Sequence, residues 1–219
     1  MKRGLWARRS LLSGMGAVAG AFAFSNRPAE AQGPAASSFE PAHHAQDEWL
    51  AKIPGKHRVV LDVTSPRGVP DAIRFVGNLF TGNKNAYGLE ESDLAMIVVF
   101  RHSATAFGYG DAIWGKYTKA LVDATDYSNP RSTEPLKGNP FNAAPRNQID
   151  GLAKRGVQFA VCETASRGIS RMLAGQGGDA EATFKEMAGN MIPSSRLVPA
   201  GVIGVTRAQE YGYRLIYAG

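Results

Sequence analysis

The sequence predicts an α/β protein, with a three-layer domain built on an open, mainly parallel sheet of about five strands. Short β-branched, apolar runs alternate along the chain with segments whose apolar residues recur at helical spacing. One short run is apolar almost throughout, as is typical of a strand covered on both faces. Strands that alternate with helices pair in parallel through right-handed crossovers, which gives a single three-layer domain.

The first strand is expected over residues 57–64, where β-branched and apolar residues are followed by a Ser-Pro-Arg-Gly turn at 65–68. Pro70 then stands where the first turn of a helix tolerates proline. Apolar residues continue at helical spacing as far as Gly82 and Asn83, where we expect this helix to end.

The middle of the domain is expected to contain a second strand, a helix and a long loop. The second strand is the nearly continuous apolar run over 93–100, and the helix is predicted over 109–121. Residues 126–145 contain four prolines and are therefore predicted to be an irregular inserted loop. A loop of this length is usually a lid, an oligomer contact or an insertion.

The carboxyl-terminal part repeats the alternation of strands and helices. A short helix over 147–155 ends at Gly156, and a third strand follows over 157–162. The remaining elements are expected to be a helix over 164–173, a helix over 180–191, a weak strand over 196–198, a helix over 202–211 and a final strand over 213–217.

Residues 1–31 have the three parts of a secretory signal: a basic stretch, an apolar run over 11–24, and the small-x-small site at 29–31. Arg8 and Arg9, followed by Ser-Leu-Leu, resemble the twin-arginine consensus. The alternative is an ordinary basic signal that happens to contain two arginines. We expect a periplasmic or secreted protein, without a stable membrane anchor because the apolar run is short for a hydrocarbon layer of roughly 30 Å.

Two further segments follow the signal. Residues 32–54 are rich in Pro, Ala, Ser and Gln and are predicted to be a flexible arm. Residues 55–219 form the predicted α/β domain.

Charge and missing motifs exclude several functions. The signal holds five basic residues and one glutamate, which leaves +2 of the net charge of +6 to the rest of the chain, so nucleic-acid binding is not expected. The chain has no Walker loop, no Gly-x-Gly-x-x-Gly opening the first helix and no Gly-x-Ser-x-Gly. These absences disfavour nucleotides, dinucleotide cofactors and a hydrolase. His43 and His44 lack spaced partners, so no metal site is expected.

The candidate site lies at the carboxyl ends of the strands, where open parallel sheets bind ligands. Cys162, the one cysteine of the sequence, ends the third strand and precedes a helix. The amino end of a helix favours a thiolate, so Cys162 is the candidate nucleophile. The alternative is that Cys162 only fills the last buried position of the strand.

Other residues near the strand ends complete the candidate site. His102 follows the second strand and could act as a general base, although a hydrogen-bonded structural role is the alternative. Arg167 could hold an anion, or could lie on a solvated helix face. Ser65, Ser103 and Thr164 are the further candidate ligand-binding residues.

Four segments of the chain, taken in order, resemble the DsrE/DsrF-like family. They are 93–100 followed by His102, then 156–162 ending in Cys162, 197–202 (Leu-Val-Pro-Ala-Gly-Val) and 209–213 (Gln-Glu-Tyr-Gly-Tyr). The resemblance covers about 57–219. It implies a small flavodoxin-like fold, assembly as trimers or hexamers, and a persulfide carried on Cys162. The chain departs from the sulfur-relay members in its export signal, in the 126–145 loop and in Ser103, which replaces a glycine.

Two functions follow as hypotheses. The first is sulfur handling, in which Cys162 accepts sulfur from a donor protein or a small sulfur species with the help of His102. The alternative is a non-catalytic oligomeric or small-ligand-binding module in which Cys162 is structural. A homo-oligomer is expected from the resemblance and from aromatic residues near loops: Trp114, Tyr117, Phe141, Tyr211, Tyr213 and Tyr217. The 126–145 loop could instead fold back and cover these aromatics within one chain.

Overall fold

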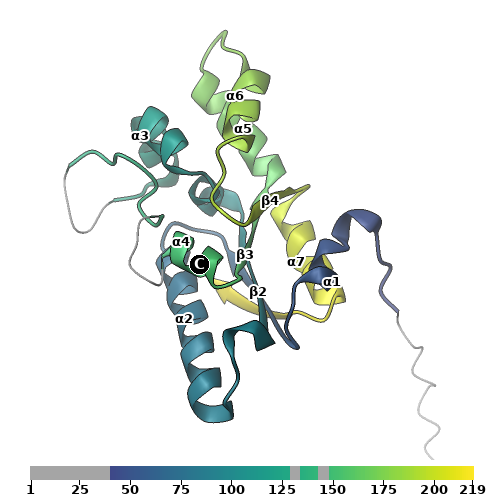
Figure 1. Ribbon diagram of the computed structural model, residues 1–219. Helices are drawn as coiled ribbons and strands as arrows, with labels where there is room; N and C mark the ends of the chain where they lie inside the picture. Colours follow the sequence, from purple (N-terminus) through teal and green to yellow (C-terminus); the bar gives the residue numbers. More distant parts are fainter. Residues whose placement is uncertain (1–39, 129–133, 143–147) are drawn as a thin grey trace, which may run out of the picture. The chain divides into compact units, whose positions relative to one another are not determined.

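The computed structural model describes residues 40–128, 134–142 and 148–219. The signal expected over 1–31 and the first residues of the predicted arm lie outside the described residues. The described chain contains one five-stranded sheet with all neighbouring strands parallel, in the order β4-β3-β2-β1-β5 (Figure 1). The strands are β1 (His57–Val63), β2 (Leu94–Phe100), β3 (Gln158–Cys162), β4 (Ser195–Val198) and β5 (Arg214–Ala218).

Helices cover both faces of this sheet and make the three layers. One face packs against α2 (Gly68–Tyr87), η3 (His102–Gly108), α3 (Asp111–Thr125), α4 (Ile149–Lys154) and α5 (Glu163–Ala174). The other face is covered by α1 (Trp49–Lys52) and α7 (Gly201–Glu210). Figure 1 shows α2 on the opposite side of the sheet from α1 and α7. The short η1 (Ala45–Asp47), η2 (Glu91–Asp93) and α6 (Ala180–Ala188) complete the described elements. The predicted fold class is confirmed.

The central strand β2 explains why the sequence specifies a covered sheet. All seven of its residues are buried. Met96, Val98 and Phe100 face the core under α2 and α3, whereas the alternate residues Ala95, Ile97 and Val99 face the core under α7. Because successive side chains of a strand point to opposite faces, an apolar run without alternation requires both faces to be covered.

The order of the strands reverses once along the chain. The chain lays down β1 to β4 side by side and then returns through α7 to place β5 on the free side of β1. The helix after β3 therefore leaves to one face of the sheet and the helix after β4 leaves to the other. Cys162 lies opposite Val198 at the ends of these two strands. Ligands of open α/β sheets bind at such a point.

Helix α2 does not end where the sequence predicts. It continues through Gly82 to Tyr87, and Gly88 ends it with a φ of 67° and an N–H bonded to the carbonyls of Asn83 and Lys84. A glycine inside a helix costs only about 1 kcal/mol. The buried Val76 and Phe80 anchor the preceding turns of α2, so packing outweighs that cost.

The folded region begins before residue 55, inside the segment predicted as a flexible arm. Leu50 of α1 is buried against the sheet, and its carbonyl accepts hydrogen bonds from Tyr213 Oη at 2.8 Å and Arg58 Nη1 at 3.1 Å. Tyr213 is distant from this segment in sequence, which is why local composition does not reveal that contact.

The described part of the 126–145 loop folds back onto the domain. Asn139 is buried, and its Nδ2 donates to the carbonyls of Phe107 (2.9 Å) and Tyr109 (2.7 Å). The ring of Phe141 packs edge-on against Phe107 at 5.2 Å between centroids. These contacts agree with the alternative in which the loop folds back and covers aromatic side chains of its own chain.

The aromatic side chains named as interface candidates differ in their exposure to solvent. Trp114, Phe141 and Tyr213 are buried inside the chain and offer no surface to a partner. Tyr217 of β5 remains 60% exposed. The homo-oligomer stays a prediction. Among the helices of the described residues, we find none that combines the length and apolar character needed to cross a membrane.

Candidate functional site

Cys162 occupies the junction between β3 and α5. It is the last residue of the strand and the N-cap of the helix, and its Sγ accepts a hydrogen bond from the Ala165 N–H at 3.4 Å. The cysteine is 7% exposed. The N–H groups of the first helical turn lack partners within the helix, so the sulfur takes the place that a capping oxygen usually fills. The sulfur thus faces the positive end of the helix dipole.

Arg101 directly follows β2, the strand that pairs with the strand of Cys162. Phe100 is opposite Val161, so the next position of each strand brings Arg101 beside Cys162. The guanidinium of Arg101 binds Asp62 of β1 through two bonds, Nε to Oδ1 at 2.6 Å and Nη2 to Oδ2 at 2.8 Å. The pKa of Arg101 is raised, chiefly by this hydrogen bond to Asp62, and negative charge on Cys162 acts in the same direction.

The first residue of α7 packs directly on Arg101. A Cβ added to Gly201 would lie 2.3 Å from the Cβ of Arg101, which no side chain could accommodate without a shift of the helix. Gly201 therefore permits the close approach of α7 to the end of β2. As a result, the arginine lies between its carboxylate partner on β1 and the amino end of α7.

The candidate residues after β1 and β2 bind one another and the backbone. His102 has a φ of 54°, and its exposed ring places Nδ1 3.4 Å from Ser103 Oγ. Ser103 Oγ donates to the Thr64 carbonyl at 3.1 Å, and Ser65 Oγ accepts from the Gly68 N–H at 3.1 Å. The bond from Ser103 to Thr64 ties the two loops together. The hydrogen bond found for the His102 ring in the described chain goes to Ser103 and not to Cys162.

The two candidates on α5 have different partners. The N–H and Oγ1 of Thr164 both donate to the Pro199 carbonyl, at 3.3 and 2.9 Å, and so join the amino end of α5 to the loop after β4. Arg167 binds the carboxylates of Glu163 at 2.8 Å and Glu181 at 3.1 Å. Two carboxylates already neutralise Arg167, which leaves less charge for an anionic ligand.

Asp62 and Arg101 were missed by the sequence reasoning, although a signal was present. Asp62 interrupts an otherwise apolar strand, and its side chain is 8% exposed. A buried carboxylate needs a charged or hydrogen-bonding partner. An arginine at the end of the neighbouring strand was the natural candidate for that partner.

A buried hydrogen-bonded pair holds the backbone of Cys162. Tyr109 Oη donates to Ser166 Oγ, which in turn donates to the Cys162 carbonyl at 2.7 Å. Tyr109 and Ser166 are both fully buried. The contact fixes the junction of β3 and α5 to the end of η3, and no local sequence pattern indicates it.

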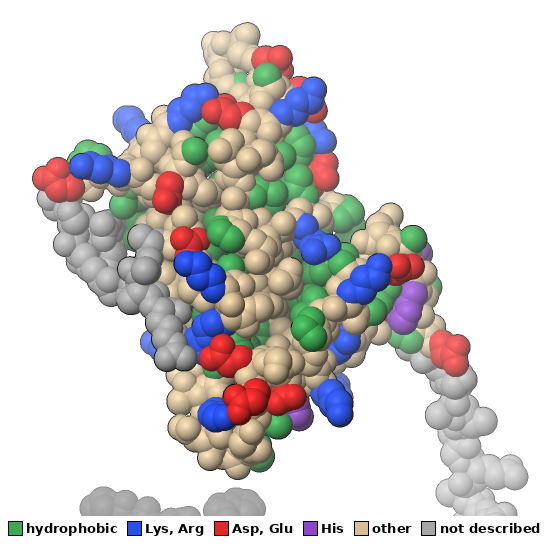
Figure 2. All heavy atoms as spheres, in the orientation of Figure 1, with side chains coloured by type: hydrophobic (Ala, Val, Ile, Leu, Met, Phe, Trp, Pro, Cys, Tyr) green, Lys and Arg blue, Asp and Glu red, His purple; other side chains and the backbone are tan. Residues whose placement is uncertain are grey.

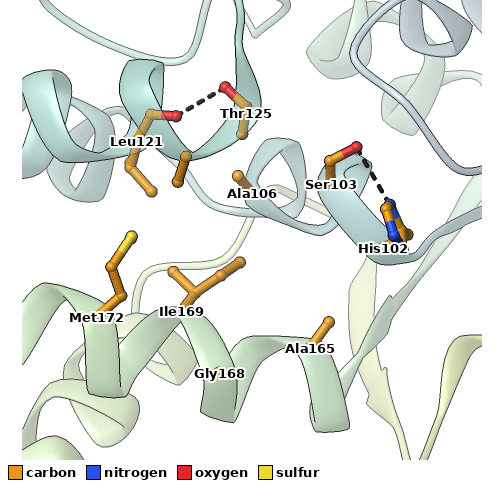
Figure 3. A pocket seen from close by; sticks show the side chains of 10 residues that line it. His102, Ser103, Ala106, Leu121, Thr125, Ala165, Gly168, Ile169 and Met172 are labelled. Carbon is orange, nitrogen blue, oxygen red and sulfur yellow. Dashed lines mark hydrogen bonds between the residues drawn. The ribbon is translucent and has the colours of Figure 1, made fainter.

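An open groove lies beside this junction, between η3, α3 and α5. Its volume is about 370 Å³. Figure 3 shows Ala106, Leu121 and Thr125 facing Ile169 and Met172 of α5 across the groove, with His102, Ser103 and Ala165 at one end. Ala165 is the residue whose N–H binds the Cys162 sulfur. Cys162 itself is not among the lining residues, and Ala165 is its link to the groove.

Charged side chains of both signs lie on the surface of the molecule. Figure 2 shows basic and acidic side chains interspersed over the face that it presents. Within residues 40–128, 134–142 and 148–219, no three His, Cys, Asp or Glu side chains gather in a way that could hold a metal ion. The chain matches no model of a known protein family, and no curated protein matches it.

Replacing Tyr109 with phenylalanine should change how stability depends on alkaline pH. Burial raises the pKa of Tyr109 to about 12. An unfolded tyrosine loses its proton near pH 10. Between about pH 10 and 12, Tyr109 therefore ionises only in the unfolded chain, and the free energy of unfolding falls as pH rises. The fall is at most about 3 kcal/mol at roughly 1.4 kcal/mol for each unit of pKa. Urea unfolding of Tyr109→Phe across this window should show a shallower fall.

The exposed Tyr87 provides the control for this measurement. Tyr87→Phe should keep the pH dependence of the original chain. If the free energy of unfolding falls equally steeply with pH for the original chain and for Tyr109→Phe, Tyr109 ionises as easily in the folded protein as in the unfolded chain.

Proposed function

We propose that the protein is an exported DsrE/DsrF-like sulfur carrier whose Cys162 accepts sulfane sulfur as a persulfide. The observation that carries the proposal is the position of the Cys162 sulfur at the amino end of α5, with the Ala165 N–H donating to it at 3.4 Å. A backbone donor and the positive end of a helix both favour the thiolate, which is the species that attacks sulfur.

The sulfur-accepting step needs no external oxidant. The thiolate of Cys162 attacks the outer sulfur of a donor persulfide, R–S–SH, and a new S–S bond forms on Cys162. The S–S bond of the donor breaks, and R–S⁻ leaves with the electron pair and is protonated by solvent. Cys162 now carries S–SH, and a second thiolate can remove the outer sulfur by the same exchange.

Two neighbouring residues have roles in this proposal. Arg101 places a guanidinium beside the sulfur, and its bidentate contact with Asp62 holds that group in position while neutralising much of its charge. His102 remains the candidate base, because its exposed ring follows Arg101 directly on the chain. The loop would have to change its conformation before the ring could bind the Cys162 sulfur.

The alternative is a non-catalytic, small-ligand-binding or oligomeric module with a structural Cys162. The low exposure of Cys162 favours this alternative, because buried cysteines are usually inert. The two functions therefore differ in one measurable property, the reactivity of the Cys162 thiol in the folded protein.

Export and assembly belong to the same proposal. The support for export is the signal-like sequence over 1–31. The support for a homo-oligomer, a trimer or hexamer by family resemblance, is the exposed apolar surface of the edge strand β5, where Leu215 and Tyr217 are solvent-exposed.

Intact-mass analysis tests the proposed function. The full chain, purified without reductant, is incubated with sodium polysulfide, freed of excess reagent and weighed. We expect one added sulfur atom that dithiothreitol removes, and no addition to Cys162→Ser, because the sequence holds a single cysteine. Spectra recorded under native conditions also give the mass of the assembly. If sulfur is added only after denaturant has unfolded the chain, Cys162 is structural and the alternative holds.

A further inference from the structure

The groove beside Cys162 has the size and the lining of a small-molecule site. Its volume of about 370 Å³ falls within the range of ligand pockets, roughly 300–1,000 Å³. None of the residues that line it is Asp, Glu, Lys or Arg, and His102 at one end is the single titratable side chain among them. Leu121, Ile169 and Met172 provide apolar walls (Figure 3). A neutral, apolar ligand matches this lining.

A glycine makes the floor of the groove on α5. Gly168 lies in the interior of this helix, where glycine is disfavoured. A Cβ at this position would meet no heavy atom within 4 Å, so the surrounding packing does not require the glycine. Its missing side chain instead leaves the groove open between Ala165 and Met172.

The groove runs along one face of α5 that leads to the cysteine. Ala165, Gly168, Ile169 and Met172 recur at the three- and four-residue spacing of a single helix face, and all of them line the groove. Cys162 lies three residues before Ala165, and its sulfur accepts a hydrogen bond from the Ala165 N–H. A molecule lying in the groove would therefore have one end at Ala165, the residue whose N–H binds the Cys162 sulfur, and the other near Met172.

We propose that the groove binds the uncharged, apolar group of a small organic persulfide or thiol and directs its sulfur toward Cys162. The inference rests on the proposed function of Cys162 and specifies its substrate class. The donor R–S–SH gives its outer sulfur to the Cys162 thiolate and leaves as R–S⁻, so R is the part that the groove holds. Donors with a charged R are disfavoured, because the lining offers a charge no ionic partner.

Thiol reagents that share one leaving group test this selectivity. Benzyl methanethiosulfonate is neutral and apolar, and sulfonatoethyl methanethiosulfonate carries a negative charge. Each reacts when the Cys162 sulfur attacks the thiol-derived sulfur, forms a mixed disulfide and releases methanesulfinate. With rates divided by those for free N-acetylcysteine, we expect the benzyl reagent to modify the full-length native chain at least about tenfold faster than the sulfonate.

Two matched variants assign that preference to the groove. Gly168→Leu fills the groove without meeting a neighbouring atom at its Cβ. In this variant the normalised rates of the two reagents should become about equal. Gly82→Leu makes the same substitution in the interior of α2, where a Cβ also meets nothing within 4 Å, and should keep the full preference. Both substitutions replace a helix-interior glycine by a better helix former.

A binding measurement separates the groove from the reactivity of the cysteine. Phenylethanethiol should raise the melting temperature of Cys162→Ser at millimolar concentration, mercaptoethanesulfonate should not, and Gly168→Leu added to Cys162→Ser should abolish the rise. If polysulfide modifies Cys162 but neither selectivity nor binding depends on Gly168, the groove inference is wrong and the proposed function stands. If the thiol binds and Cys162 never reacts in the folded chain, the groove is a site and the sulfur-carrier proposal is wrong.

Discussion

Arg101→Leu should lower the free energy of unfolding by about 3–5 kcal/mol, the usual cost of removing one partner from a buried ion pair. The carboxylate of Asp62 is 8% exposed and accepts two hydrogen bonds from the Arg101 guanidinium. Leucine would leave that carboxylate in the interior without a charged partner. Urea or guanidinium denaturation near neutral pH measures the loss.

Two further variants identify the cause of this loss. Arg74→Leu removes an arginine from an exposed pair with Asp71, and should cost at most about 1 kcal/mol. Asp62→Leu combined with Arg101→Leu removes both charges and should recover a large part of the stability, because no unpaired carboxylate remains. A loss for Arg101→Leu no greater than that for Arg74→Leu would show that water reaches Asp62 freely.

The double variant also separates stability from chemistry at Cys162. Asp62→Leu with Arg101→Leu should fold, yet it lacks the guanidinium beside the sulfur. We therefore expect slower sulfur uptake from polysulfide by this folded variant than by the original chain. Equal rates would mean that the amino end of α5 alone activates the cysteine.

The strands could be predicted well because their signal is local. The seven residues of β2 are apolar without alternation, and that pattern by itself requires helices on both faces. The position of Cys162 at the end of a strand was predicted for the same reason, since a β-branched apolar run ends there and a helical pattern begins. A strand end followed by a helix also defines where a parallel sheet binds ligands.

Features that depend on distant contacts could not be predicted from local pattern. The bond from Tyr213 to the Leu50 carbonyl joins residues far apart in the chain, and Tyr109 reaches Ser166 in the same way. Trp114 illustrates the limit most clearly. Its position on a short helix next to a proline-rich loop indicated an exposed interface, but the loop folds over it and the side chain is fully buried.

Phe107→Ala should cost about 3–5 kcal/mol of unfolding free energy, the usual range for deletion of a buried aromatic ring. Phe107 is fully buried in η3 and lies at the centre of an aromatic cluster. Its ring centroid is 5.0 Å from that of Trp114, 5.6 Å from Tyr127 and 5.2 Å from Phe141. The variant removes three ring contacts at once and leaves a cavity between α3 and the loop.

The same variant tests whether the loop belongs to the core of the chain. Asn139 binds the Phe107 and Tyr109 carbonyls, so loss of the Phe107 ring should loosen residues 134–142 and speed their cleavage by a protease under native conditions. Tyr87→Ala truncates an exposed aromatic side chain and should change neither stability nor cleavage appreciably. If Phe107→Ala leaves the cleavage of 134–142 unchanged, Asn139 alone holds the loop, and the aromatic cluster contributes to stability without positioning it.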